Sequence, residues 1–335
     1  MENLIQNKKL IAIGEALIDF IPDIPGGAIK DVNAFLPAVG GAPANVCGAF
    51  TKLGGRSEMI TQLGTDGFGD KILETFKNAG IGSSFVKRTD KANTSLAFVA
   101  LQEDGNREFS FYRNPGADML FEAEDVNAEW FEDAYALHFC SVSLGDFPMK
   151  EAHCRAIQYA MEKDAIVSFD PNLRPALWKD SAEMIATVKE FIPLADIVKI
   201  SDEELESITG ETSIETALEK LFTDRVKLVI YTEGSKGAKA FTKKASAVAE
   251  CAKVKAVDTT GAGDGFIGAF LWCLYRDGVT AERIEELRGD KLEEYLKFAN
   301  AFCGISVQKK GAIPSYPTLA DIEYVDRGLC HHSFS

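Results

Sequence analysis

Apolar and polar residues follow two different periods along the second half of the chain. Short apolar runs rich in Val, Ile and Leu predict buried strands, and stretches with an apolar residue every three or four positions predict amphipathic helices. Strands are expected at 137–142, 166–170, 197–200, 228–232 and 238–242, and helices at 149–163, 182–191, 203–209 and 293–307. Strands that alternate with helices in this way are typical of a mostly parallel sheet with helices on both faces. The pattern therefore predicts an α/β fold.

The first half of the chain contains one feature that such a series does not explain. Strands are expected at 10–14 and 57–63, and helices at 43–53 and up to residue 79. The segments 94–102 and 107–112, however, are both rich in β-forming residues and flank the sequence EDGN. Asp-Gly between two such runs predicts a β-hairpin. A hairpin does not belong inside a series of strand–helix units, so we expect a separate small sheet.

Residues 258–264, with the sequence DTTGAGD, lie between an alternating run at 251–257 that predicts a strand and an apolar periodic run that predicts a helix. The Gly-Ala-Gly turn therefore stands at a helix start, where backbone N–H groups and the helix dipole bind anions such as phosphate. Asp264 in the first helical turn has two interpretations. It is either a helix cap or a general base that takes a proton from a hydroxyl attacking that phosphate.

The composition limits the classes of partner. The net charge is −15, and no Lys/Arg cluster is present, which argues against nucleic acid and anionic membranes as partners. No apolar run approaches the roughly 20 residues that a membrane span requires, and the polar start of the chain does not read as a leader. We therefore expect a soluble, cytoplasmic protein. The seven cysteines are scattered without C-x-x-C spacing and are expected to be buried hydrophobic residues rather than disulfides or ligands.

Six motifs together resemble one enzyme family. Residues 258–264 resemble the second signature of the ribokinase-like (PfkB) carbohydrate kinases, and residues 40–45 (GGAPAN) resemble the first. Four further runs are similar to those of fructokinases in this family: GEALIDF at 14–20, FYRNPGAD at 111–118, DPNLR at 170–174 and KGAIP at 310–314. The motifs follow the family's order from about residue 10 to about residue 320.

The resemblance implies a particular architecture. One ribokinase-like domain would extend over residues 1–325, with three α/β/α layers, a mostly parallel central sheet and a small β-sheet lid. The lid would comprise residues 17–38 and 94–121, close over the sugar and pair two subunits in a homodimer. Apart from the resemblance, residues 326–335, which include Cys330, His331 and His332, are expected to form a frayed tail, with adventitious metal binding as the alternative.

The resemblance also assigns the catalytic and sugar-binding residues. Asp264 would be the general base, and the backbone N–H groups of Gly261, Ala262 and Gly263 would stabilise the transferred phosphoryl group. The residues that would hold the sugar are Asp19, Gly41, Asn45, Arg113 and Arg174. Each has an ordinary structural alternative: a turn acid at Asp19, a loop glycine at Gly41, a residue of an ordinary helix at Asn45, an exposed strand-end charge at Arg113 and a partner of Asp170 at Arg174.

For ATP, the resemblance implies contacts from strand ends and from one helix. The residues are Lys199, Glu204, Thr232, Gly234, Gly237 and Asn300. Glu204 matches the family's Asn-x-x-Glu pattern, which orders Mg²⁺ through water, although Ser201 replaces the Asn. The sequence contains no P-loop fingerprint, and its GxGxxG at 263–268 overlaps the kinase signature. A monovalent cation such as K⁺ is implied at Asp258, Thr260, Gly311 and Ser315.

These expectations describe an ATP-dependent sugar kinase that phosphorylates D-fructose at the 6-hydroxyl. A kinase of the same fold for 2-keto-3-deoxygluconate, another hexose or a nucleoside is one alternative. An acidic substrate would require extra positive groups near Arg174. A non-catalytic sugar-binding regulatory protein is the alternative from another class, and loss of Asp264 or of the Gly-Ala-Gly turn would favour it. Both features are present in the sequence.

Overall fold

The structure is a computed structural model of the 335-residue chain and describes residues 7–24, 26–101 and 107–328. Nine strands of these residues form one large sheet in the order β13-β12-β11-β10-β9-β8-β1-β4-β5. They are β1 (Lys9–Ile13), β4 (Ser57–Gly64), β5 (Val86–Thr89), β8 (Ala134–Cys140), β9 (Ile166–Asp170), β10 (Ile197–Ser201), β11 (Leu228–Thr232), β12 (Ala238–Phe241) and β13 (Ser246–Ala249). Within this sheet, only β12 runs antiparallel to its neighbours, β11 and β13. The mostly parallel sheet is therefore confirmed.

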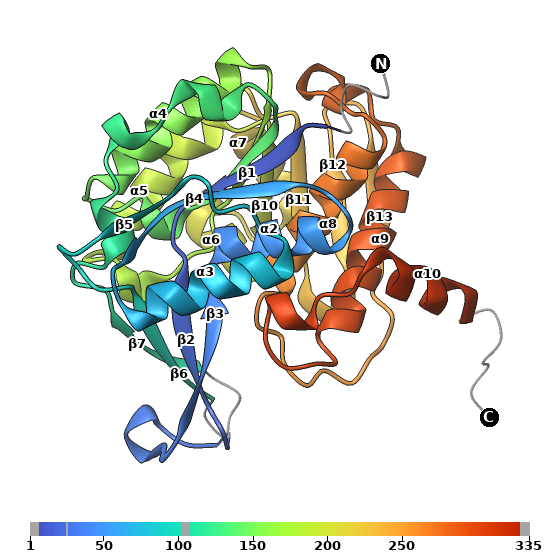
Figure 1. The fold of residues 1–335 in the computed structure, drawn as a ribbon. Helices are drawn as coiled ribbons and strands as arrows, with labels where there is room; N and C mark the ends of the chain where they lie inside the picture. The colour runs from blue at the N-terminus through green and yellow to red at the C-terminus, as the bar shows by residue number, and fades with distance from the viewer. Residues whose placement is uncertain (1–6, 25, 102–106, 329–335) are drawn as a thin grey trace, which may run out of the picture.

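Helices cover both faces of the large sheet, which gives the three expected layers (Figure 1). One face carries α2 (Ala42–Lys52), α3 (Gly67–Ala79), α8 (Ala262–Arg276) and α9 (Gly289–Ser306). The other face carries α4 (Met149–Glu162), α5 (Ser181–Phe191), α6 (Asp202–Thr209) and α7 (Ile214–Leu221). The last described helix, α10 (Leu319–Gly328), packs against α9.

The two faces of β1 show why the strands read as continuous apolar runs. Leu10 and Ala12 enter the core beneath α2 and α8, whereas Ile11 and Ile13 enter the core beneath α4 and α5. Successive strand residues point to opposite faces, so a strand buried on both sides is apolar at every position. This packing fixes the carboxyl ends of the parallel strands along one edge of the sheet.

A second, four-stranded sheet projects from that edge, and we call it the lid (Figure 1). Its order is β3-β2-β6-β7, with β2 (Leu17–Pro22), β3 (Phe35–Gly40), β6 (Leu96–Leu101) and β7 (Arg107–Tyr112). The antiparallel pairing of β6 with β7 confirms the predicted hairpin, although its turn at 103–106 lies outside the described residues. Parallel pairing of β2 with β6 joins the two expected lid segments into one sheet.

The strand expected at 251–257 is wrong, because these residues form no regular secondary structure. The side chains of Val254 and Val257 are 41% and 58% exposed, so the alternation marks no buried face. The backbone N–H groups of Val257 and Asp258 both donate to the carbonyl of Val307, just after α9. The segment is therefore attached to a helix end instead of a sheet. The sequence patterns also missed the short elements β5, β13 and α7.

The expected C-terminal boundary of the domain at residue 325 stays a prediction. Helix α10 continues beyond residue 325, and residues 329–335, with Cys330, His331 and His332, lie outside the described part of the chain. Across the described residues, we find no helix that combines the length and the apolar character needed to cross a bilayer.

Candidate active site

Two cavities meet where the parallel strands end. The first, which we call the lid cavity, has a volume of about 420 Å³ and lies between the lid and the start of α8. The second, which we call the strand-end cavity, has a volume of about 940 Å³ and lies beside the ends of β9 and β10. Both are lined at their junction by the same residues: Asn172, Arg174, Thr259, Gly261 and Asp264. Open α/β sheets bind ligands at this edge.

The turn before α8 has a conformation that requires glycine. Gly261 has a φ of 70°, and a Cβ there would lie 2.5 Å from the Ala312 Cβ and 2.7 Å from the Tyr316 hydroxyl. The Tyr316 hydroxyl instead donates to the Gly261 carbonyl at 2.7 Å. Of the three expected phosphate-binding N–H groups, that of Ala262 already donates to the Thr259 carbonyl at 3.2 Å. The residues after Asp258 thus form a compact turn at the positive end of the α8 dipole.

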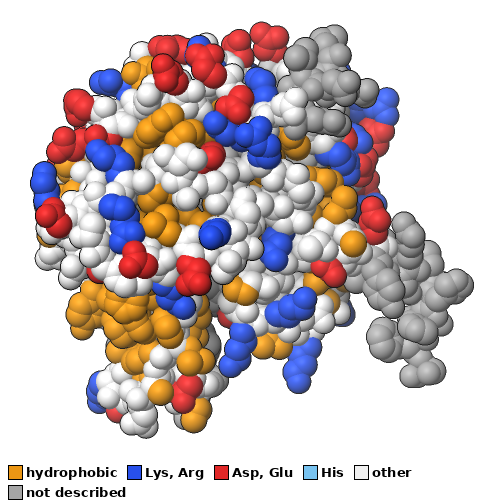
Figure 2. Space-filling view, viewed as in Figure 1, with side chains coloured by type: hydrophobic (Ala, Val, Ile, Leu, Met, Phe, Trp, Pro, Cys, Tyr) orange, Lys and Arg blue, Asp and Glu red, His pale blue; other side chains and the backbone are white. Residues whose placement is uncertain are grey.

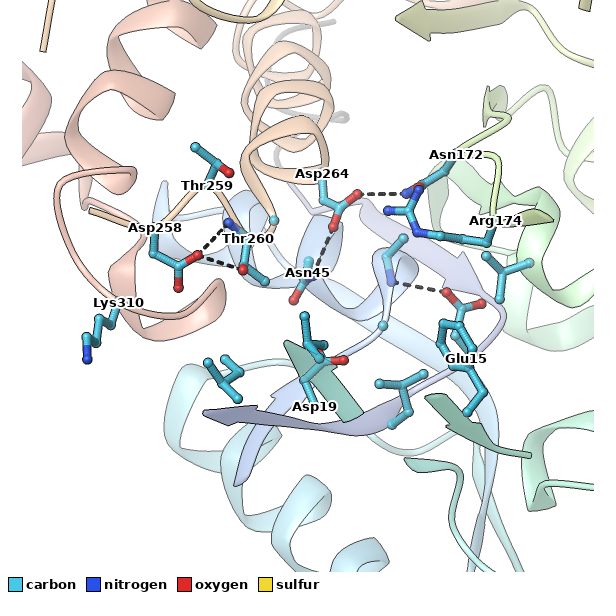
Figure 3. Close-up of a pocket in the computed structure, with 18 of the residues that line it drawn as sticks. Glu15, Asp19, Asn45, Asn172, Arg174, Asp258, Thr259, Thr260, Asp264 and Lys310 are labelled. Atoms are coloured by element: carbon cyan, nitrogen blue, oxygen red, sulfur yellow. Dashed lines mark hydrogen bonds between the residues drawn. The ribbon is translucent and has the colours of Figure 1, made fainter. Parts of the chain in front are cut away.

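Asp264 lies buried at the junction, in the first turn of α8. Its two oxygens are held by two amides: Asn45 Nδ2 donates to Oδ2 at 2.9 Å and Asn172 Nδ2 donates to Oδ1 at 3.2 Å (Figure 3). Burial raises the pKa of Asp264, and the Asn45 amide and the positive charges of Lys199 and Arg174 oppose that rise. The carboxylate is therefore fixed in orientation at the place where the two cavities meet.

Asn45 reaches Asp264 because of the tight entry into α2. Gly41 has a φ of 107°, and a Cβ there would lie 2.4 Å from the Glu15 carbonyl oxygen, so glycine is required. The next N–H, of Ala42, donates to Glu15 Oε1 at 3.1 Å. Asn45 Oδ1 is buried and has no hydrogen-bond partner among the described residues. Asn45 thus donates to the carboxylate and keeps an acceptor for a ligand hydroxyl.

Lys199 lies within β10, beneath the Gly-Ala-Gly turn. Its Nζ pairs with Asp170 Oδ2 at 2.8 Å, and both side chains are buried. A Cβ on Gly263 would lie 3.2 Å from this ammonium, which shows how close it is to the turn. Burial raises the pKa of Asp170 to about 6, and the Lys199 charge limits the rise. Although burial opposes it, the Asp170 charge raises the pKa of Lys199, so the ammonium stays protonated.

Glu204 begins α6 and joins two loops. Its Oε2 accepts from the Ser201 N–H at 2.9 Å and from the Ser201 hydroxyl at 2.7 Å, in a capping box. Its Oε1 accepts from the Leu173 N–H at 2.7 Å. Burial would raise the pKa of Glu204, but the Lys199 charge and these hydrogen bonds lower it. Glu204 is thus an ionised side chain on the wall of the strand-end cavity.

Asp19 and Arg174 line the lid cavity from opposite sides. Asp19 on β2 packs against Gly40, where a Cβ would collide with the Asp19 carboxylate. Arg174 follows β9, is exposed and donates from Nη1 to the Leu173 carbonyl at 2.8 Å. Figure 3 shows its guanidinium beside Asn172 and Asp264. Both predicted sugar ligands therefore border the lid cavity. Asp19 lies within a strand and not in a turn, and the hydrogen bond described for Arg174 goes to Leu173 and not to Asp170.

The expected role of Arg113 as a sugar ligand stays a prediction, and the structure shows other partners for its guanidinium. Its buried guanidinium donates from Nε to Asp118 Oδ2 at 2.9 Å, forms a second contact with that oxygen through Nη2, and donates to the Val142 carbonyl and the Ser143 hydroxyl. Arg113 is not part of the lining of either cavity described above. Asp118 thus holds the Arg113 guanidinium in a buried ion pair.

Two residues at the site had no predicted role. Glu15 is almost fully buried, lines the lid cavity and accepts from the Ser143 hydroxyl at 2.9 Å. Asn172 donates directly to Asp264. Both belong to motifs used for the resemblance, GEALIDF and DPNLR. The available signal in the sequence was an acid or an amide two residues after the end of a buried strand.

The remaining ATP-binding candidates lie beyond the two cavities. Thr232 ends β11, Gly234 and Gly237 have φ values of 55° and 113° in the following turn, and Asn300 lies on α9. The Asn300 amide donates to the Ala249 carbonyl at 2.9 Å. Asn300 thus fixes the chain after β13, and the nucleotide contacts of these four residues stay predictions.

The expected monovalent-cation residues are only partly grouped. Asp258 accepts from the Thr260 N–H at 2.9 Å and from the Gly311 N–H at 2.8 Å, so three of the four form one cluster. The Ser315 hydroxyl lies within 2.7 Å of the Ser306 hydroxyl and donates to the Ala312 carbonyl at 2.8 Å.

Comparison with known proteins places this arrangement in context. The family model for pfkB family carbohydrate kinases matches residues 7–319. A similar curated protein is the probable fructokinase-5 of Arabidopsis thaliana, which is 43% identical over 315 residues, or 94% of this chain and 96% of the relative.

Solved structures show the same fold. The fructokinase from Xylella fastidiosa with bound ATP superposes with a TM-score of 0.89 at 33% identity, covering 97% of this chain and 100% of the other. The fructokinase from Vibrio cholerae O395, in a form that contains fructose, ADP and calcium ion, superposes with a TM-score of 0.84 at 32% identity over 95% of this chain and 99% of the other.

Proposed function

The chain belongs to the pfkB family of carbohydrate kinases, and we propose that it transfers the γ-phosphoryl group of ATP to the 6-hydroxyl of D-fructose. It is a phosphotransferase with an alcohol group as acceptor. One observation carries the proposal for the reaction: the buried Asp264 is shared by the lid cavity and the strand-end cavity. A sugar in the first and a triphosphate in the second would meet at its carboxylate.

Asp264 acts as the general base in this proposal. One of its oxygens takes the proton of the sugar hydroxyl while the hydroxyl oxygen forms a bond to the γ-phosphorus. The bond from the γ-phosphorus to the bridging oxygen breaks, and ADP leaves with that oxygen. The carboxylate must be ionised beforehand, and the Lys199 and Arg174 charges favour that state.

The start of α8 and Lys199 stabilise the transferred phosphoryl group. The N–H groups of Gly261 and Gly263 and the positive end of the helix dipole face developing negative charge. The Ala262 N–H contributes only if it exchanges its bond with the Thr259 carbonyl for the phosphate. Lys199 adds a full positive charge beneath the same turn.

The residues around the strand-end cavity fit a hydrated Mg²⁺. Magnesium prefers oxygen ligands and keeps several waters. Glu204 is an ionised carboxylate on the cavity wall, and Asp170 Oδ1 is buried without a hydrogen-bond partner. We propose that Glu204 holds Mg²⁺ through water, where the ion neutralises charge on the ATP phosphates. A monovalent cation near Asp258, Thr260, Gly311 and Ser315 belongs to the same proposal, with Ser315 contributing through its backbone.

The charges of the lid cavity favour a neutral sugar over 2-keto-3-deoxygluconate. Its lining contains the carboxylates of Glu15, Asp19, Asp258 and Asp264 but only the cations of Arg174 and Lys310. A substrate carboxylate would add one more negative charge to this set. The fructose and ADP in the Vibrio cholerae enzyme and the fructokinase names of the relatives support fructose among the neutral sugars.

The exposed apolar side chains of the lid support two proposals, closure over the sugar and pairing of two subunits. Figure 2 shows hydrophobic side chains gathered on the lid, and Leu36 and Tyr112 are 58% and 65% exposed. An apolar patch of this kind marks an interaction site. We propose that two lids pair in a homodimer and that each closes over its sugar to exclude water. The single domain over residues 1–325 and the cytoplasmic location stay predictions.

ATP consumption with fructose, ribose, glucose, 2-keto-3-deoxygluconate and adenosine, with and without K⁺, tests the function. The highest kcat/KM is expected with fructose, and phosphorus NMR of the product should place the ester on the 6-oxygen. Higher kcat/KM with another compound would replace the substrate and keep the mechanism. If none of the five compounds is turned over while fructose still raises the Tm, the result would support the alternative of a non-catalytic sugar-binding protein.

A further inference from the structure

The predicted base is held by two amides that come from different parts of the chain. Asn45 stands in the first turns of α2, and Asn172 is the second residue after the end of β9. Each amide donates to a different oxygen of Asp264, Asn45 to Oδ2 at 2.9 Å and Asn172 to Oδ1 at 3.2 Å. The carboxylate plane is therefore fixed by two donors, whereas one donor would leave it free to rotate about its last bond.

The backbone around Asn172 serves to present this amide. Asn172 has a φ of 45°, in the left-handed region that Asn tolerates better than most side chains. On one side the chain is fixed by Asp170, paired with Lys199, and on the other by the Leu173 N–H, which donates to Glu204. The side chain is nine-tenths buried and lines both cavities. These bonds on both sides hold the backbone of Asn172 in place, so its amide has a fixed position at the junction of the two cavities.

We propose that Asn172 is a positioning residue that orients the Asp264 carboxylate toward the sugar hydroxyl and keeps it ionised before transfer. This inference rests on the proposed phosphotransfer. Asn172 donates to one oxygen and thereby leaves the remaining lone pairs of Asp264 directed toward the lid cavity, where the acceptor hydroxyl binds. Nothing in the DPNLR motif alone distinguishes this role from a sugar or phosphate contact.

The charges around Asp264 make the amide important for its protonation. Burial raises the pKa of Asp264, and the Asn45 amide, the Lys199 and Arg174 charges and the Asn172 amide lower it. The other titratable groups that interact with Asp264 are Asp170 on β9, Cys140 on β8, Cys303 on α9 and Tyr316 before α10; Glu15 lines the same cavity. Of these, Asp170 is a carboxyl whose negative charge disfavours ionisation of Asp264, so the loss of one amide donor should raise the pKa of Asp264 further.

Asn172→Asp and Asn172→Gly separate positioning from folding. Asn172→Asp keeps the shape and the left-handed backbone but replaces the donor with a carboxylate, so kcat should fall about 10- to 100-fold and the acidic limb of the kcat–pH profile should rise by about one pH unit or more. Asn172→Gly keeps the backbone, so kcat should fall about 10-fold with a smaller shift of that limb. The KM for sugar and for ATP should change by less than about 3-fold, because a hydrogen bond to the base contributes little to ground-state binding.

The control is Asn78→Asp, which makes the same chemical change at an exposed position of α3 and should leave kcat and the pH profile unchanged. Retention of kcat within 2-fold in both Asn172 variants, or an unchanged acidic limb in Asn172→Asp, would overturn the proposal. A sugar KM that rises more than kcat falls would also overturn it, because Asn172 would then be a sugar ligand. The variants are measured with whichever sugar the wild-type enzyme phosphorylates, so failure with fructose alone counts against the proposed substrate and not against Asn172.

Discussion

The start of α8 and the lid border the same cavity but are built from opposite kinds of interaction. At the start of α8, a buried carboxylate, Asp264, is held by two amides, and the Tyr316 hydroxyl fixes the preceding turn. In the lid, Phe98 stacks on Phe20 at 4.6 Å between ring centroids and meets Phe35 edge-on at 5.2 Å. Hydrogen bonds are directional, whereas apolar contacts are not.

This difference separates two requirements of a sugar kinase. Proton and phosphoryl transfer need one geometry, which polar bonds to a rigid helix start provide. The proposed closure over a sugar and the proposed pairing of two subunits need a surface that tolerates displacement, which an aromatic sheet provides. Substitutions at the start of α8 should therefore change kcat, and those on the outer face of the lid should change association.

The largest effect should come from Asp264→Asn, which keeps the shape of the side chain and removes the base. We expect kcat to fall by about two to four orders of magnitude, the usual contribution of general-base catalysis. Fructose should still raise the Tm, since Asn45 and Arg174 remain. Asp290→Asn, on the exposed first turn of α9, is the control. Near-normal turnover of the Asp264 variant would falsify the assignment.

Lys199→Met should have the next largest effect, because it leaves the Asp170 carboxylate buried without its cation. Removing one partner of a buried ion pair costs about 3–5 kcal/mol of unfolding free energy. The KM for ATP should also rise. Lys163→Met, which breaks the more exposed pair with Glu132, should cost far less.

The same variant should change the pH dependence of stability. In the wild type, burial raises the pKa of Asp170 from 3.8 to about 6, so the folded state binds a proton that the unfolded state has released. The contribution of Asp170 to the unfolding free energy therefore decreases as pH rises from about 4 to about 6. Without Lys199, the pKa of Asp170 in the folded state should rise above 6. The unfolding free energy of the variant should therefore continue to fall above pH 6, and urea unfolding should show the difference from the wild type growing with pH. A constant difference from pH 5 to pH 8 would contradict this account.

Gly261→Ala should have a smaller but clear effect on the same helix start. The new Cβ meets a left-handed φ of 70° and the side chains of Ala312 and Tyr316. We expect kcat/KM to fall about 10- to 100-fold, because a shift of about 1 Å at a catalytic group has that order of cost. Gly304→Ala, in a helix where a Cβ meets nothing within 4 Å, should raise stability by about 0.5–1 kcal/mol. Equal loss of activity in both variants would show that the effect is not specific to the turn before α8.

The smallest effect on turnover should come from Leu36→Glu on the lid. A charge on the apolar face should convert the proposed dimer into a monomer, with kcat within about 3-fold of the wild type if each subunit has a complete site. Val248→Glu is the matched control, since both side chains are 58% exposed and Val248 lies on β13 at the far edge of the large sheet. Light scattering measures the mass. A dimer that persists in Leu36→Glu places the interface elsewhere.

Local sequence signals predicted most of the fold and the central part of the site. The strands β9 and β11 have the predicted bounds, because strands buried on both faces show uninterrupted apolar runs between polar residues. Asp264 could be singled out because its motif combines a glycine turn, a helix start and an acid within a few residues. At 251–257 the same kind of local signal failed, since alternation without a neighbouring strand does not make a sheet.

Residue roles that depend on distant partners could not be predicted. Asn172 and Asp264 are 92 residues apart, and only the folded chain brings the loop after β9 and the start of α8 together. Arg113 shows the opposite case, because its partner Asp118 lies five residues away in the same motif. A buried arginine next to an acid was a signal for an ion pair, but the sequence does not show which side chains are buried.

The contacts of Gly311 and Tyr316 with the turn before α8 also make this turn dependent on a later part of the chain. The Gly311 N–H donates to Asp258, and the Tyr316 hydroxyl donates to the Gly261 carbonyl. These partners lie 53 and 55 residues further along the chain than the groups they hold. The phosphate-binding turn is therefore supported only while the chain is intact as far as Tyr316.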